Sequence, residues 1–125
     1  MVLYIHAGLL ILAGLLFLAG VSVARRKTGR GWLRFHKAVS VLALMLMIAA
    51  VAVMFAFKQK SGYPHFSSVH SVIGLAGLVI AFLLPAAGLM MLKGVRVLRP
   101  VHRRTGHVLL FVILIAIILG VLRVL

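Results

Sequence analysis

The sequence predicts an all-α integral membrane protein whose four helices form an up-down-up-down bundle. Hydrophobic residues make up 65% of its 125 residues, and they gather in four apolar runs that exceed the roughly 18 residues typical of a transmembrane helix. Three basic segments of about eight residues join these runs. Connections this short make consecutive helices antiparallel neighbours. We therefore expect one transmembrane domain over residues 1–125.

The first apolar run predicts a helix over about residues 3–24. Ser22-Val23-Ala24 resembles a signal-peptide cleavage site, but no positive residue precedes the run as a signal peptide requires, so we expect this helix to be retained. Pro100 is suited to the start of the last helix. The other three apolar runs predict helices over about residues 33–57, 66–92 and 101–122.

Charge is distributed as in a membrane protein. The chain has fourteen Lys and Arg and no Asp or Glu. A net charge of +14 would suit a nucleic-acid partner, but the cations form short blocks between apolar runs, so we expect a lipid bilayer and no nucleic acid. The first and third loops with their flanks carry eleven cations and the opposite side three. The positive-inside rule therefore predicts that both termini lie on the non-cytoplasmic side.

The residue types that are missing exclude several chemistries. Without Asp or Glu the side chains offer no carboxylate for acid–base catalysis or proton transport. Without Cys the chain cannot form an iron–sulfur cluster or attach a c-type haem covalently. Six histidines are left as the side chains that ligate metals well or titrate near neutral pH.

One histidine lies near the start of each predicted helix. Because the helices alternate in direction, His6 and His70 should lie at the outer end of the bundle, and His36 and His102 at the cytoplasmic end. About fourteen residues, or roughly 20 Å, separate the two levels. Two imidazoles at each level suit a haem iron better than zinc, which prefers three or four protein ligands. We therefore predict two histidine-ligated haems, one near each membrane face.

Two further histidines, His65 and His107, lie outside these four. His65 follows Pro64 at the interface and is expected to be a surface residue. His107 matches the depth of His36 as well as His102 does, so it remains an alternative fourth ligand. Beside His102, Arg103 and Arg104 could pair with haem propionates, or be interfacial residues only.

Glycines accompany two of the histidines at matched spacings. Gly74 and Gly106 follow His70 and His102 by four residues, and Gly88 and Gly120 lie fourteen residues further on. We expect these four glycines to give a porphyrin room against the helix backbone. Simple helix packing is the alternative explanation.

Three short motifs resemble the cytochrome b561 family: His70-Ser-Val-Ile-Gly74, Pro100-Val-His102 with Gly106, and Arg34-Phe-His36-Lys37. The resemblance covers the four-helix core, which is nearly the whole chain. It implies two haem b groups, one held by His6 and His70 and one by His36 and His102, and so favours His102 over His107.

The resemblance also implies a function. Such a protein passes electrons across the membrane from a donor such as a quinol or ascorbate to an acceptor on the other side. It would act alone, as a homodimer, or as the membrane subunit of a larger redox complex. The alternative is a structural membrane subunit or small transporter in which the histidines only pack.

Overall fold

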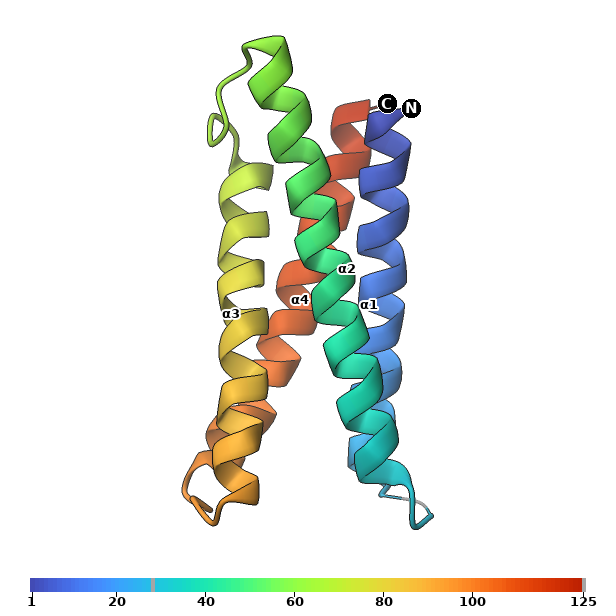
Figure 1. Ribbon diagram of the computed structural model, residues 1–125, viewed down its shortest axis with the longest axis vertical. Coiled ribbons are helices and arrows are strands. Elements are labelled where there is room, and N and C mark those ends of the chain that lie inside the picture. The colour runs from blue at the N-terminus through green and yellow to red at the C-terminus, as the bar shows by residue number, and fades with distance from the viewer. Residues whose placement is uncertain (28, 125) are drawn as a thin grey trace.

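The computed structural model describes residues 1–27 and 29–124 and, of Val124, the backbone alone. The predicted all-α fold is confirmed, and all four helices are long and apolar enough to cross a membrane. Consecutive helices run antiparallel (Figure 1). The helices are α1 (Val2–Arg26), α2 (Trp32–Ser61), α3 (Val69–Leu92) and α4 (Leu98–Val124).

The bundle consists of two helical hairpins. Helix α1 packs mainly on α2, and α3 packs mainly on α4. Between the hairpins, α1 contacts α4 and a smaller contact joins α2 to α3. Helices α1 and α3 therefore lie on one diagonal of the bundle and α2 and α4 on the other (Figure 1).

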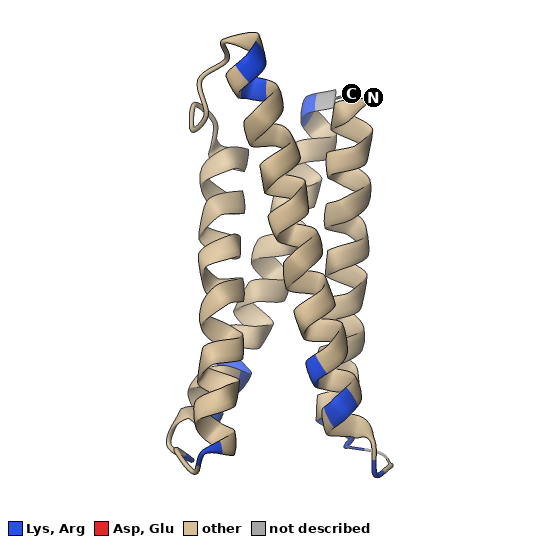
Figure 2. Cartoon of the chain, viewed as in Figure 1, with Lys and Arg blue, Asp and Glu red and all other residues tan. Residues whose placement is uncertain are grey.

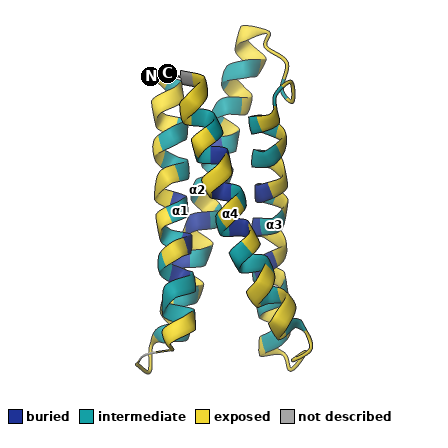
Figure 3. Cartoon of the chain, turned by 180° about the vertical axis from the view of Figure 1, so that it is seen from behind, coloured by how far each residue is buried: buried dark blue, intermediate teal, exposed yellow. Residues whose placement is uncertain are grey.

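The core lies midway along the helices (Figure 3). Every buried side chain among the described residues is apolar, whereas large apolar side chains such as Leu15, Val41 and Phe111 are more than half exposed. Helices that are apolar on all sides, with their exposed faces apolar too, suit a lipid environment. The core cluster consists of Ala13, Phe17, Ala43, Met47, Ala81, Leu84, Leu109 and Ile113.

Three helix ends differ by three or more residues from the apolar runs that predict them. Helix α2 continues from the expected end at residue 57 to Ser61, which brings Lys58 and Lys60 into its last turn, where cations stabilise a helix. Helix α4 begins at Leu98 rather than residue 101, so Pro100 lies in its first turn, where the missing N–H removes no helical bond.

Helix α3 begins at Val69 rather than residue 66 because a capping box fixes its start. The Ser71 backbone N–H donates to Ser68 Oγ, and the Ser68 N–H donates to Ser71 Oγ, each over 3.2 Å. Such a cap satisfies backbone donors that the first helical turn leaves free. The helix then continues through Pro85.

Cations gather at one end of the molecule (Figure 2). We call this the basic end; it contains the loop 93–97 and, from the connection between α1 and α2, residues 27 and 29–31. Both termini and the loop 62–68 lie at the other end, which we call the terminal end (Figure 1). The Lys and Arg residues of the terminal end are Lys58, Lys60 and Arg123.

The loop 62–68 is held against the end of α2. Lys58 Nζ donates to the carbonyls of Pro64 and His65, both over 3.0 Å. The His65 ring stacks on Phe55 with 4.1 Å between ring centres, and its Nε2 is hydrogen-bonded to Gln59 Oε1 over 3.0 Å. His65 is thus half-buried within this loop rather than fully exposed at the surface.

Candidate functional site

Four histidines, one from each helix, form two pairs inside the bundle. The ring centres of His6 and His70 are 6.0 Å apart, with an angle of 81° between the ring planes. The ring centres of His36 and His102 are 6.2 Å apart, with an angle of 77°. All four rings are half-buried. Each pair joins two diagonal helices, one pair toward the terminal end and the other toward the basic end.

Helical periodicity directs these rings inward. Residues seven and eleven positions after a helical residue lie close to the same face, because these offsets are near two and three full turns. Both positions after His6 are buried, and the same holds for the other three histidines. The buried residues at these offsets are Ala13, Phe17, Ala43, Met47, Gly77, Ala81, Leu109 and Ile113. The histidines therefore share the faces that form the core.

Three of the four rings are oriented by a backbone carbonyl of the hairpin partner. The partner helix carries a paired histidine of its own, and the accepting carbonyl belongs to the residue fourteen positions after that second histidine. The bonds run from His6 Nδ1 to Ala50 O (2.9 Å), from His36 Nδ1 to Gly20 O (3.0 Å) and from His70 Nδ1 to Ala116 O (2.9 Å). A neutral ring that donates through Nδ1 carries its lone pair on Nε2, so Nε2 is the atom available to a metal.

His102 differs from this arrangement. Its Nδ1 is buried and makes no hydrogen bond within the described part of the chain. The equivalent carbonyl, fourteen residues after His70, is that of Leu84, which lies beside the ring. The three carbonyls that accept a bond belong to glycine or alanine, whereas this one belongs to a larger residue.

Gly88 and Gly120 contact histidine rings. A Cβ built on Gly120 would lie 3.0 Å from His70 Cε1, and a Cβ on Gly88 would lie 3.4 Å from His102 Cε1. The same holds on α1, where a Cβ on Gly20 would lie 3.6 Å from His36 Nδ1. The sequence predicts that Gly88 and Gly120 make room for a porphyrin. In the structure, each of these two glycines leaves room for the imidazole of the neighbouring helix.

Gly74 and Gly106 lie in open surroundings. A Cβ on either residue would meet no other atom within 4 Å, apart from those of its own turn of helix. Both residues are half-buried. Packing between the described side chains therefore does not require glycine at these two positions.

His107 lies away from the two pairs. Its Nδ1 is hydrogen-bonded over 2.7 Å to the carbonyl of Arg103, one turn earlier in α4. Together with Leu110, Phe111 and Leu114 it lines a shallow groove, and Phe111 is 67% exposed. The structure thus brings His102, and not His107, opposite His36. Arg103 and Arg104 are exposed at the basic end.

The two pairs fit an iron with two axial imidazoles. Metal–nitrogen bonds to imidazole are about 2 Å long and the ring centre lies about 1 Å behind the nitrogen, so two opposed imidazoles have centres about 6 Å apart. Both measured separations agree with this value. No group of three or more His, Cys, Asp or Glu occurs within the described residues, so neither pair belongs to a four-ligand protein site of the zinc type.

Sequence reasoning found the four paired histidines but not the carbonyls that orient three of them. A backbone acceptor has no residue type of its own. The available signal was indirect: a small residue, Gly20, Ala50 or Ala116, stands fourteen positions after three of the histidines.

Comparison with known proteins gives one match. Residues 2–125 match the family described as eukaryotic cytochrome b561. No curated protein and no solved structure matches the chain significantly.

Proposed function

Because the chain belongs to the cytochrome b561 family, we propose that it binds two haem b groups, one toward each end of the bundle. Membership of this family, together with four membrane-spanning helices, makes the chain a multi-pass membrane protein with a haem-b electron-transfer role. In our proposal His6 and His70 ligate the haem at the terminal end. His36 and His102 ligate the haem at the basic end.

The observation that carries this proposal is the presence of two histidine pairs with ring centres 6.0 and 6.2 Å apart. Each pair has the ring spacing that two imidazoles would need in order to hold one iron between them. Four helices contribute one histidine each, and none of the four is left over. Histidines that served only to pack the helices would not need to form two pairs with nearly the same ring separation.

The hydrogen bonds of the rings support the same roles. In metalloproteins the nitrogen opposite the metal commonly donates to a carbonyl, which fixes the ring and raises its basicity. His6, His36 and His70 make such a bond through Nδ1. We propose Nε2 as the ligating atom of all four histidines.

The two sites would be linked across the membrane by an apolar core. Gly20, whose carbonyl orients His36, lies fourteen residues from His6 on α1, which corresponds to about 20 Å along the helix. Bound haem supplies a one-electron couple at each level. The core residues between the levels hold the helices together and exclude water. Because the chain has no Asp or Glu, its side chains offer no carboxylate relay for a proton to follow the electron.

Gly74 and Gly106 remain part of this proposal. Each lies one turn after a paired histidine, on the same helix face, and a Cβ there would meet no described atom within 4 Å outside its own stretch of helix. We propose that these two glycines give the porphyrin access to the backbone. Gly88 and Gly120 would act indirectly, through the position of the imidazoles.

The proposal also covers the sidedness of the protein, its electron donor and its partners. Eleven cations at the basic end against three at the terminal end support a cytoplasmic basic end and termini on the opposite side. We propose a quinol or ascorbate as electron donor and an acceptor on the other side of the membrane. The exposed apolar faces of the helices leave room for a second copy or a partner redox subunit.

The test is haem content in purified protein. We expect two haem b per chain and a reduced-minus-oxidised spectrum typical of a b-type cytochrome. Replacing any one of the four paired histidines by Ala should remove about one haem, whereas His107→Ala should retain both. Absence of haem from the wild type would favour the alternative of a structural or transport subunit. Loss of one haem in His107→Ala, with none lost in His102→Ala, would reassign the fourth ligand.

A further inference from the structure

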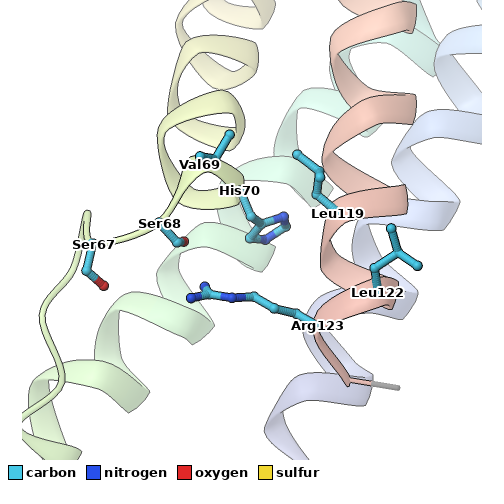
Figure 4. Close-up of a pocket in the computed structure, with 7 residues that line it drawn as sticks. All are labelled: Ser67, Ser68, Val69, His70, Leu119, Leu122 and Arg123. Atoms are coloured by element: carbon cyan, nitrogen blue, oxygen red, sulfur yellow. The ribbon is translucent and has the colours of Figure 1, made fainter.

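A cavity opens beside His70 at the terminal end of the bundle (Figure 4). Its volume is about 450 Å³, and its walls come from the segment that leads into α3 and from the last turns of α4. The polar side chains in its wall are those of Ser67, Ser68, His70 and Arg123, and Leu119 contributes an apolar surface. The cavity thus combines a proposed haem ligand with a cation and two hydroxyl groups.

Arg123 is directed toward this cavity. Its side chain extends from α4 toward the start of α3, beside His70 (Figure 4). A cation in the last turn of a helix favours the helix dipole, but that effect does not require the side chain to reach toward the neighbouring helix. The sequence contains no Asp or Glu, so no carboxylate side chain of this chain can pair with the guanidinium.

The two lysines of the terminal end, Lys58 and Lys60, do not offer their charge to this cavity. Lys58 Nζ is already bonded to the carbonyls of Pro64 and His65. Lys60 is exposed on the last turn of α2 and does not line the cavity. Arg123 is therefore the cation that the cavity offers to a ligand.

We propose that this cavity binds a carboxylate, with Arg123 as its ion-pair partner and the Ser67 hydroxyl as a further donor. A guanidinium binds a carboxylate through two parallel hydrogen bonds. The Ser67 hydroxyl is free to contribute, because its contact with the Pro64 carbonyl is 3.5 Å long, at the limit of a hydrogen bond. The carboxylate we assign to it is a propionate of the haem held by His6 and His70, so this inference rests on the proposed function.

An anionic electron donor such as ascorbate offers the same chemistry. Bound in this cavity, it would also lie next to His70 and pair with Arg123. The two sources predict different effects. A propionate is part of the haem, so its ion pair changes the equilibrium between oxidised and reduced iron. A free donor changes the rate at which the haem is reduced.

The test compares the midpoint potentials of both haems in the wild type and in Arg123→Gln, Arg123→Lys and Lys60→Gln. A nearby positive charge favours the reduced, less positive haem. We expect Arg123→Gln to lower the potential of the terminal-end haem by about 59 mV, a tenfold change in its oxidised-to-reduced ratio for one electron. Arg123→Lys should retain most of the wild-type potential, and Lys60→Gln all of it. The His36→Ala background, which keeps only the terminal-end haem, assigns the affected potential.

Reduction by ascorbate distinguishes the sources. Unchanged potentials with about a tenfold higher half-saturating ascorbate concentration in Arg123→Gln would support a carboxylate site that serves the donor. Unchanged potentials and unchanged kinetics in a variant that keeps both haems would overturn the proposal. If Arg123→Gln does not fold, wild-type behaviour of Arg123→Ala and of Ser67→Ala in both measurements would overturn it equally. A wild-type protein without haem would instead contradict the proposed function.

Discussion

At the scale of single residues, the position of each paired histidine depends on a neighbouring helix that leaves room for its ring. Gly120 lies closest to a ring, since a Cβ there would approach His70 Cε1 to 3.0 Å. That distance is shorter than ordinary van der Waals contact, so a methyl group must displace the imidazole. Displacement would strain the 2.9 Å bond between His70 Nδ1 and the Ala116 carbonyl.

We therefore expect Gly120→Ala to weaken binding of the terminal-end haem about tenfold or more, as loss of a ligand-orienting contact commonly does. Gly8→Ala, at an exposed glycine of α1 without a neighbour within 4 Å, adds only a methyl group and is the control. Haem titration of the apoprotein measures both. Equal affinity in Gly120→Ala and wild type would show that the His70 ring has more freedom than this geometry implies.

The sequence was a good guide to which residues form the site and a poor guide to how they are held. His6, His36, His70 and His102 stand out because an apolar helix has no need of an imidazole. The acceptors at Gly20, Ala50 and Ala116 are main-chain atoms, so residue identity does not reveal them. The partner of Gly120 depends on the distance between α3 and α4 and on the rotamer of His70, neither of which hydropathy encodes.

At the scale of helices, alanine sets the close approach within the first hairpin. Ala13 on α1 and Ala43 and Ala50 on α2 are fully buried. Small residues let two membrane helices approach each other closely, where dispersion contacts are most favourable. This close packing holds His6 and His36 at carbonyls of the opposite helix.

Enlarging this contact should destabilise the bundle. We expect Ala43→Leu to cost about 1–3 kcal/mol, as overpacking of a filled core does. Val41→Leu lies two residues away on an exposed apolar face, where Val41 is 53% exposed, and should change stability little. Thermal unfolding of both variants in one detergent makes the comparison. Equal melting temperatures of the two variants would mean that α1 and α2 can move apart at Ala43 without loss of stability.

The loop 62–68 depends on one lysine. Lys58 Nζ donates two hydrogen bonds to this loop, whereas Lys60 is exposed and takes no part in them. We expect Lys58→Met to speed amide exchange in the loop about fivefold for each hydrogen bond lost, since a net contribution of about 1 kcal/mol is typical of one hydrogen bond. Lys60→Met should leave exchange unchanged. Similar exchange in the two variants would show that the stacking of His65 on Phe55 suffices to hold the loop.

Helix existence was predictable and helix ends were less so. Four long apolar runs that contain no acidic residue predict four transmembrane helices. The ends depend on local interactions. The reciprocal hydrogen bonds of Ser68 and Ser71 place the start of α3 at Val69. Lys58 and Lys60 stabilise the last turn of α2, which lies beyond its apolar run. Hydropathy averages over windows too wide to register either effect.

At the scale of the whole molecule, the two ends differ in ways that would separate the potentials of the two proposed haems. The basic end has eleven Lys and Arg residues and the terminal end three, and positive charge favours reduced iron. Within the described residues, His102 Nδ1 makes no hydrogen bond of the kind that His6 and His70 make. A ligand without that bond is less basic and stabilises oxidised iron less.

Both differences act in the same direction. We expect the haem at the basic end to have the higher midpoint potential, with the gap narrowing as ionic strength rises and screens the exposed cations. Redox titration of His36→Ala and His70→Ala, each of which should retain a single haem, gives the two values separately. A higher potential in His36→Ala than in His70→Ala would contradict this order.

The diagonal pairing of the histidines has a consequence for biogenesis. Each pair takes one ring from the hairpin α1–α2 and one from the hairpin α3–α4, although the two hairpins contact each other less than the helices within them do. A newly inserted first hairpin would therefore present two half-sites and no complete one. Under the proposed ligation, neither haem can be bound by two histidines until the second hairpin has been inserted. Each bound haem would then link the two hairpins to each other. Haem supply would govern the final assembly step of this protein, as well as its activity.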